Sequence, residues 1–119
     1  MSLLSALKNC LEKIDPHVCY GKCSDDYVKE NGWNVIVFNR RSIRKLNKDL
    51  VKTFEISICR ESSIDEDLAM QIIKAVTGET KLKFPEQDMP YSYIKKGESD
   101  DVVEILTLTF TKQEKNVFC

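Results

Sequence analysis

The chain has 119 residues with 18 basic and 19 acidic side chains, a formal net charge of −1 and a hydrophobic fraction of 42%. This size fits one globular domain over residues 1–119 and leaves no room for a second. The balanced charge argues against a general nucleic-acid coat or a cationic membrane binder, whose affinity needs a large basic excess.

The first predicted element is a helix over residues 3–14. Its leucines and isoleucine recur at the i, i+3, i+4 and i+7 spacing that places apolar side chains on one helix face. Pro16 lacks an amide hydrogen and disfavours helical geometry at Asp15, so we expect the helix to end at this pair.

Residues 18–38 are predicted to form two strands separated by polar loops. A short strand is expected over residues 18–22, and the polar residues 24–26 and 30–32 are typical of loops. Residues 33–38 are β-branched or aromatic at most positions and apolar on both faces, which indicates a central strand.

The composition changes at residue 39, where basic side chains begin to predominate. Because such a segment adds little to a core, we expect an exposed basic loop over about residues 39–50, or a short helix that orders on assembly. The candidate residues of this loop for contact with a neighbouring subunit or DNA are Arg40, Arg41, Arg44, Lys45 and Lys48.

A second helix is predicted after Ser63, because residues 63–66 fit the capping box in which Ser63 and Glu66 satisfy each other's backbone amides. Gly78 is expected to end this helix in the left-handed conformation. The predicted buried stripe of the helix consists of Leu68, Ala69, Ile72, Ile73 and Val76.

The remaining strands are predicted from alternating apolar and polar side chains. Residues 52–60 indicate a half-buried antiparallel strand, and residues 91–96 and 102–112 form the strongest hairpin signal. The sequence therefore predicts an α+β domain with a mainly antiparallel sheet of four to five strands. The N-terminal helix and the second helix would pack against this sheet, and a long β-hairpin would end the chain.

The five cysteines, an odd number without a CxxC pair, favour reduced thiols in a cytosolic compartment. His17, Cys19 and Cys23 would spread along an extended segment rather than converge on one ion, so we expect no metal and no cofactor. The sequence also has no apolar run long enough to span a membrane, which predicts a soluble protein.

The sequence contains no Gly-rich phosphate loop, HExxH or GxSxG motif, so we expect no enzymatic activity. A small enzyme using His17 with Cys19 is the least supported alternative. Tyr91 and Tyr93 have strand spacing and could stack nucleobases, but the acidic turn beside them favours core or subunit packing.

Two stretches of this chain resemble small phage and prophage tail proteins of the tail-terminator or tail-completion type. Residues 54–66 are similar to the central segment of that family, with an alternating strand, an Arg-Glu pair and an acidic-capped helix. Residues 91–96 and 102–112 are similar to its closing hairpin. The chain departs from the family at residues 64–66, where close relatives would carry a proline-bearing turn, and its cysteines have no role in the family.

The resemblance implies a noncatalytic subunit that closes into a ring, commonly hexameric, on the end of a completed tail tube. Its partners would be further copies of itself, the tube and possibly sheath proteins, and a neck or head-tail connector protein, with passing contact to DNA. It would assemble in the bacterial cytoplasm and remain in the virion or a tail-like particle. The candidate subunit-interface residues are Tyr91, Tyr93, Glu98, Asp100, Asp101 and Glu104.

The alternative function is a small nucleic-acid-binding or regulatory module that uses the basic loop. Its cations would contact phosphates and give strongly salt-dependent binding. The charges are, however, segregated into this loop and acidic clusters at residues 61–67 and 98–104. Two complementary surfaces on one subunit suit head-to-tail assembly, although neighbours within the folded chain could also satisfy them.

Overall fold

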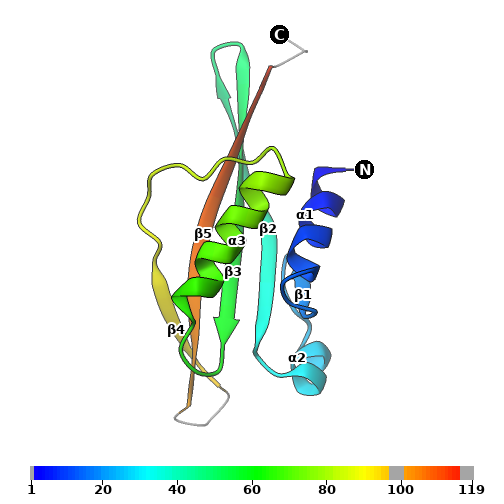
Figure 1. Cartoon of the computed structure of the whole chain (residues 1–119), viewed down its shortest axis with the longest axis vertical. Coiled ribbons are helices and arrows are strands. Elements are labelled where there is room, and N and C mark those ends of the chain that lie inside the picture. Colours follow the sequence, from blue (N-terminus) through cyan, green and yellow to red (C-terminus); the bar gives the residue numbers. More distant parts are fainter. Residues whose placement is uncertain (1, 97–100, 116–119) are drawn as a thin grey trace.

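The computed structural model describes residues 2–96 and 101–115 of the chain (Figure 1). None of the helices in this part of the chain is long and apolar enough to cross a lipid bilayer. The helices and strands in chain order are α1 (Leu3–Glu12), β1 (Val18–Tyr20), α2 (Asp25–Asn31), β2 (Val35–Leu46), β3 (Asp49–Arg60), α3 (Glu66–Glu79), β4 (Tyr91–Lys95) and β5 (Val102–Lys115).

The strands form one sheet in the order β1-β2-β3-β5-β4. β1 runs parallel to β2, and the other three pairs are antiparallel. This arrangement confirms the predicted α+β class and the mainly antiparallel sheet. The predicted closing hairpin is also confirmed, because β4 pairs with β5 from Tyr91 opposite Leu106 to Lys95 opposite Val102.

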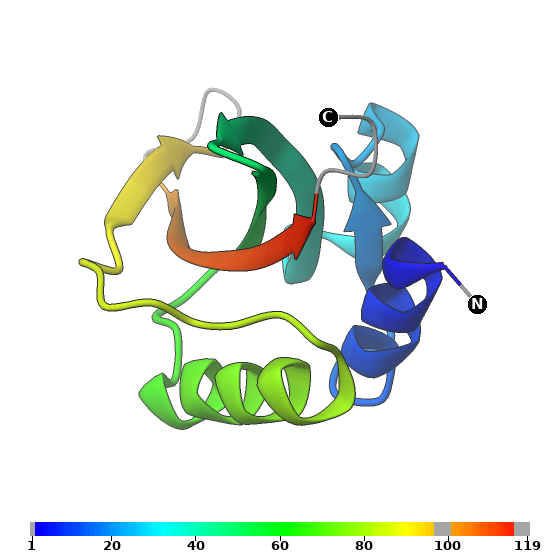
Figure 2. The same cartoon turned by 90° about the horizontal axis from the view of Figure 1, so that it is seen from above.

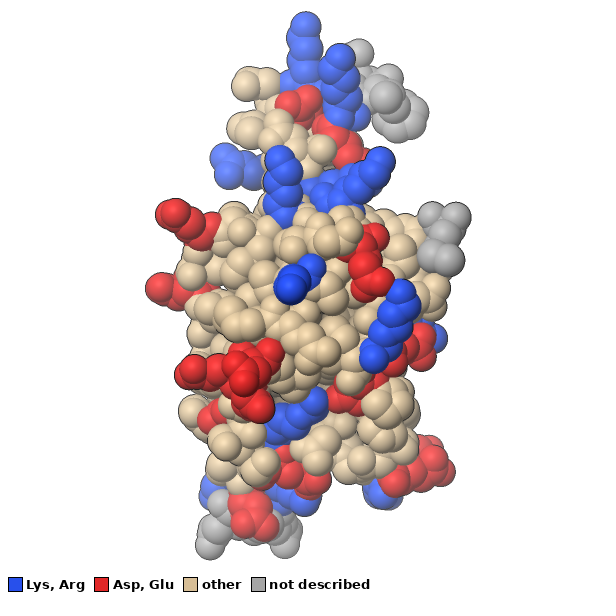
Figure 3. Space-filling model, in the orientation of Figure 1, with Lys and Arg blue, Asp and Glu red and all other residues tan. Residues whose placement is uncertain are grey.

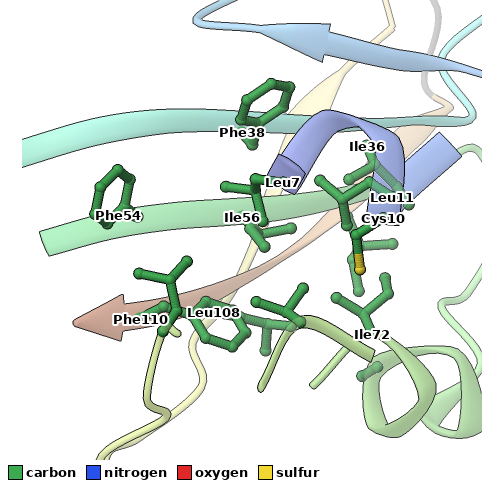
Figure 4. Packing of buried hydrophobic residues seen from close by; sticks show 14 of the residues in the cluster. Leu7, Cys10, Leu11, Ile36, Phe38, Phe54, Ile56, Ile72, Leu108 and Phe110 are labelled. Carbon is green, nitrogen blue, oxygen red and sulfur yellow. The ribbon is translucent and has the colours of Figure 1, made fainter. Parts of the chain in front are cut away.

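The main core lies between one face of the sheet and the helices α1 and α3, which contact each other (Figures 1 and 2). Alternate side chains of β2, β3 and β5 point into this layer and meet Leu7, Leu11 and Ile72 of the helices (Figure 4). A smaller cluster on the other face joins Val35 and Val103 to the aromatic side chains near α2. The alternation predicted for residues 52–60 is confirmed, because Phe54, Ile56 and Ile58 are buried in this core.

The N-terminal cap of α3 differs from the predicted capping box at Ser63. Asp65 is the cap, and its Oδ1 accepts a hydrogen bond from the Asp67 amide at 2.9 Å. Ile64 is only 6% exposed, and its amide donates to Glu104 Oε1 at 2.8 Å, which fixes the incoming segment before the helix begins. The helix also continues through Gly78 to Glu79, so the predicted stop at Gly78 is wrong.

Residues 25–31 form α2, so the loops predicted at residues 24–26 and 30–32 are wrong. Ser24 caps this helix by accepting from the Tyr27 amide at 3.1 Å, and acidic side chains in the first turn suit the positive end of the helix dipole. Gly32 follows with a φ of +79°, a conformation that favours glycine.

The loop predicted over residues 39–50 is instead a β-hairpin formed by the ends of β2 and β3. Residues 40–48 are exposed as expected, but backbone pairing from Arg40 opposite Phe54 to Leu46 opposite Asp49 makes this segment two strands and a turn. A bulge between Arg40 and Ser42 shifts the register, and Asn47 turns the chain with a φ of 54°. Along this segment β3 is also paired with β5 on its other side, which supports the hairpin.

Cys19 and Cys23 form a disulfide, which corrects the expectation of reduced thiols at these positions. Gly21, with a φ of +78°, turns the chain between them, so their Cα atoms lie 5.6 Å apart rather than spread along one strand. Cys10 and Cys59 are buried free thiols, and Cys119 lies outside the described residues.

Candidate functional site

The most distinctive surface is the cationic hairpin, which we define as residues 39–52 of β2, β3 and their turn. It extends beyond the helices at one end of the molecule and contributes to an elongated shape of 51 × 27 × 27 Å (Figure 1). Blue side chains gather over this end in Figure 3. All five basic residues predicted for this segment lie on the hairpin and are exposed: Arg40, Arg41, Arg44, Lys45 and Lys48.

The cations of the hairpin differ in how far they are already engaged. Arg40 Nε donates a hydrogen bond to the Tyr20 hydroxyl at 3.1 Å, which ties this guanidinium to β1. Within residues 2–96 and 101–115, the side chains of Arg41, Arg44, Lys45 and Lys48 form no ion pair. These four charges are available to a partner.

Glu114 of β5 provides a counter-charge beside the cationic hairpin, where it is paired with Leu50 near the turn. Its carboxylate pairs with Lys112 and Lys52, each at 2.8 Å. Hydrogen bonds from the Lys112 and Lys52 ammonium groups lower the pKa of Glu114 to about 2. Sequence patterns missed this trio because its members are brought together by the register of β3 and β5.

The Glu114 contacts make a pH-dependent contribution to stability. The folded pKa lies below the value of about 4.3 for an unfolded glutamate. The contribution is therefore present above about pH 4 and is lost as the pH falls toward about 2. We expect wild type to exceed Glu114→Gln in urea-unfolding stability at neutral pH, and this difference to shrink on acidification. A difference that stays constant with pH would contradict this contribution.

The edge strand β4 is the second exposed surface. It is hydrogen-bonded to β5 within the described sheet, and every one of its residues is exposed. Tyr91, Tyr93 and Ile94 are 45%, 58% and 40% exposed, which leaves three large side chains with apolar surface beside an open sheet edge. Open edges of this kind are sites where a further strand or loop can pair.

Glu104 holds the edge strand to the body of the protein. Its Oε2 accepts a hydrogen bond from the Tyr93 hydroxyl at 3.0 Å, while Oε1 accepts from the Ile64 amide at 2.8 Å. The bond to Glu104 raises the pKa of Tyr93, because ionised tyrosine could not donate it. The structure thus brings Tyr93 and Glu104 together, but it gives Glu104 an intramolecular role.

Replacing Glu104 with alanine is expected to lower the free energy of unfolding by about 2 kcal/mol. The substitution leaves the amide of buried Ile64 without its acceptor, and an unsatisfied buried group costs about 1–3 kcal/mol. Tyr93→Phe, which removes only the exposed bond, is the matched control and should cost less. Urea denaturation measures both, and equal losses would show that the Ile64 bond contributes nothing.

Of the other predicted interface residues, the structure describes Tyr91 and Asp101. Tyr91 is exposed on β4, and the Asp101 carbonyl accepts from the Lys96 amide at 2.9 Å beside the start of β5. Glu98 and Asp100 lie outside the described residues. In the predicted acidic cluster at 61–67, Glu61 forms an ion pair with Lys96, so part of that charge is used within the chain.

A third surface, which we call the acidic groove, lies between α3 and the segment that leads into β4. Its volume is about 550 Å³. The side chain of Gln87 positions the outer wall by bonding the Thr109 carbonyl at 2.8 Å and the Thr109 amide at 2.9 Å. The groove is lined by Glu66, Asp67, Ala69, Met70, Gln87, Asp88, Met89, Tyr91 and Leu106, with no basic residue among them.

The catalytic and metal-binding alternatives gain no site from the described residues. His17 Nδ1 lies 3.2 Å from the Tyr27 hydroxyl, and Cys19 is joined to Cys23, so Cys19 offers no free thiol for His17 to activate. Across residues 2–96 and 101–115, no three His, Cys, Asp or Glu side chains are grouped to hold a metal ion.

The sequence matches no protein-family model and no curated protein.

Proposed function

We propose that this chain is a noncatalytic structural subunit that closes into a ring and caps or completes a tube, as the phage tail proteins that it resembles do. The observation that carries this proposal is the open edge of β4, where every residue is exposed and three of the side chains are large. A neighbouring subunit or the last ring of the tube would cover this edge by strand addition. The ring, which we propose to be a hexamer, would present its other side to a neck or connector protein.

Assembly and capping can be measured separately. Mass photometry over a concentration series should show a discrete closed species, and electron microscopy of polymerising tube protein should show shorter tubes when the chain is added. We expect Ile94→Lys to weaken ring formation, because it places a charge on the edge that a neighbour covers. Asn31→Lys at the exposed end of α2 adds the same charge away from β4 and from the acidic groove and is the matched control. An unchanged oligomer in Ile94→Lys would rule out β4 as the interface.

A second function, binding of duplex DNA, is favoured by the four unpaired cations of the hairpin. The hairpin, with β5 paired alongside it, can present these cations to DNA phosphates. Replacing Arg41, Arg44, Lys45 and Lys48 with serine should weaken binding. It should also reduce the slope of log affinity against log salt concentration by about 0.9 for each phosphate that is no longer neutralised. Fluorescence anisotropy with duplex DNA at several salt concentrations measures this slope. Wild-type affinity that is weak and independent of salt would exclude this function.

A further inference from the structure

We propose that the cationic hairpin of one copy docks in the acidic groove of the next copy. This inference rests on the proposed ring and names the interface that would close it. It commits to a second copy of this chain as the occupant of the groove, because the two surfaces match in charge and in apolar character.

The acidic groove has carboxylates without counter-charges. Glu66, Asp67 and Asp88 are exposed along it, and their carboxylates form no ion pair with another described residue. Between them lie apolar side chains, including Met70, which is 50% exposed, and Tyr91. The groove therefore suits a positively charged partner that also carries exposed apolar groups.

The cationic hairpin has these properties. Its unpaired cations are Arg41, Arg44, Lys45 and Lys48, as described above. Two large apolar side chains stand among them, since Ile43 is 63% exposed and Leu46 is 42% exposed. Complementary charges fix the register of an interface, while burial of such side chains supplies most of its free energy.

The position of the two surfaces favours association between copies. The hairpin extends from one end of the long axis, whereas α3 and the segment before β4 lie alongside the body (Figure 1). In Figure 3, red side chains lie along the left side of the body below the blue end, and further red side chains lie at its right and lower edges. Because each copy offers two different surfaces, the contact is heterologous and repeats around an axis, which closes a ring when the rotation permits.

A mixing experiment with charge reversals tests this pairing. One variant replaces the four unpaired cations of the hairpin with glutamate, Arg41→Glu, Arg44→Glu, Lys45→Glu and Lys48→Glu, and the other replaces the three carboxylates of the groove with lysine, Glu66→Lys, Asp67→Lys and Asp88→Lys. In either variant alone, hairpin and groove have the same sign and repel each other. In an equimolar mixture, each hairpin meets a groove of opposite sign, so assembly should return with the two variants alternating around the ring.

Sedimentation velocity at low salt gives the expected results. Each variant alone should associate at least about tenfold more weakly than wild type, since like charges replace opposite ones. The mixture should regain near wild-type association. A variant with Glu12→Lys and Glu30→Lys, both exposed and outside the two surfaces, should behave as wild type. Circular dichroism melting confirms that all variants are folded.

These experiments distinguish a failure of the hairpin–groove interface from a failure of the proposed ring. If wild type forms a ring but the mixture does not recover, the hairpin–groove pairing is wrong and the ring stands. If wild type stays monomeric at every concentration and with tube protein present, both are wrong. If hairpin reversal removes binding of duplex DNA and leaves association intact, the hairpin serves nucleic acid, which overturns this inference.

Discussion

Replacing Asp15 with alanine is expected to lower the free energy of unfolding by about 3 kcal/mol. Asp15 is only 8% exposed, and its Oδ2 accepts from Arg60 Nη2 at 2.8 Å while its Oδ1 accepts from the His17 amide at 2.9 Å. Alanine leaves the half-buried guanidinium of Arg60 without its carboxylate. This ion pair joins the turn after α1 to the end of β3, so its removal affects two parts of the fold.

A second substitution separates the effect of the Asp15 charge on stability from that of its hydrogen bond to the His17 amide. Asp15→Asn retains an acceptor for the His17 amide and should cost less than alanine. Lys13→Ala removes one partner of an exposed pair with Glu79 and is the matched surface control, with little change expected. Urea denaturation of the three variants provides the comparison. If Asp15→Ala is no more destabilised than Lys13→Ala, the buried pair does not stabilise the fold.

The regular elements of the core could be predicted from the sequence because their burial follows a period. α1 and α3 each place apolar side chains on one face, and β3 and β5 alternate. The boundaries were less predictable. Whether Ser63 or Asp65 caps α3 depends on Glu104, which is distant in sequence and holds the Ile64 amide.

Three features could not be predicted from the sequence, because contacts with other parts of the fold stabilise them. The cationic hairpin has a sequence unsuited to a core, and the pairing of β3 with β5 supports it as a ribbon. α2 is short and polar, and its stability depends on the Ser24 cap and on packing of Tyr27. The Cys19–Cys23 disulfide depends on the turn at Gly21, which spacing alone does not reveal.

The candidate surfaces could be predicted only in part. The cations at residues 40–48 could be predicted as one surface because they are close together in the sequence and all lie on one hairpin. The acidic groove draws Glu66 and Asp67 from α3 and Asp88 from a segment expected to be irregular. The residues that line the groove could therefore be identified only from the fold. The hydrogen bonds from the Gln87 side chain to the Thr109 backbone, which hold the outer wall in place, are one such feature.

Shortening the cationic hairpin is expected to abolish ring assembly while leaving the fold intact. In the design, Asn-Gly replaces residues 43–52, so that Ser42 and Thr53, which pair across β2 and β3, flank a two-residue turn. None of the removed residues is buried, and the core begins at Phe54, which is 3% exposed. The design also removes the pairing of residues 49–52 with β5 and the half-exposed Lys52–Glu114 ion pair. The free energy of unfolding should therefore fall by about 3 kcal/mol, at about 1 kcal/mol for each backbone hydrogen bond lost, while the core remains.

A second variant keeps the full-length hairpin but replaces Arg44, Lys45 and Lys48 with serine. It separates the contribution of the hairpin's charge to assembly from that of its length. If the interface is mainly electrostatic, this variant should associate as weakly as the shortened one, and raised salt should weaken the wild-type ring in the same way. If the apolar surface of Ile43 and Leu46 contributes most, the serine variant should retain association that the shortened chain lacks. Mass photometry of the two variants beside wild type gives the comparison. Rings formed by the shortened chain at wild-type concentrations would show that the hairpin has no part in assembly, and would leave the β4 edge as the candidate interface.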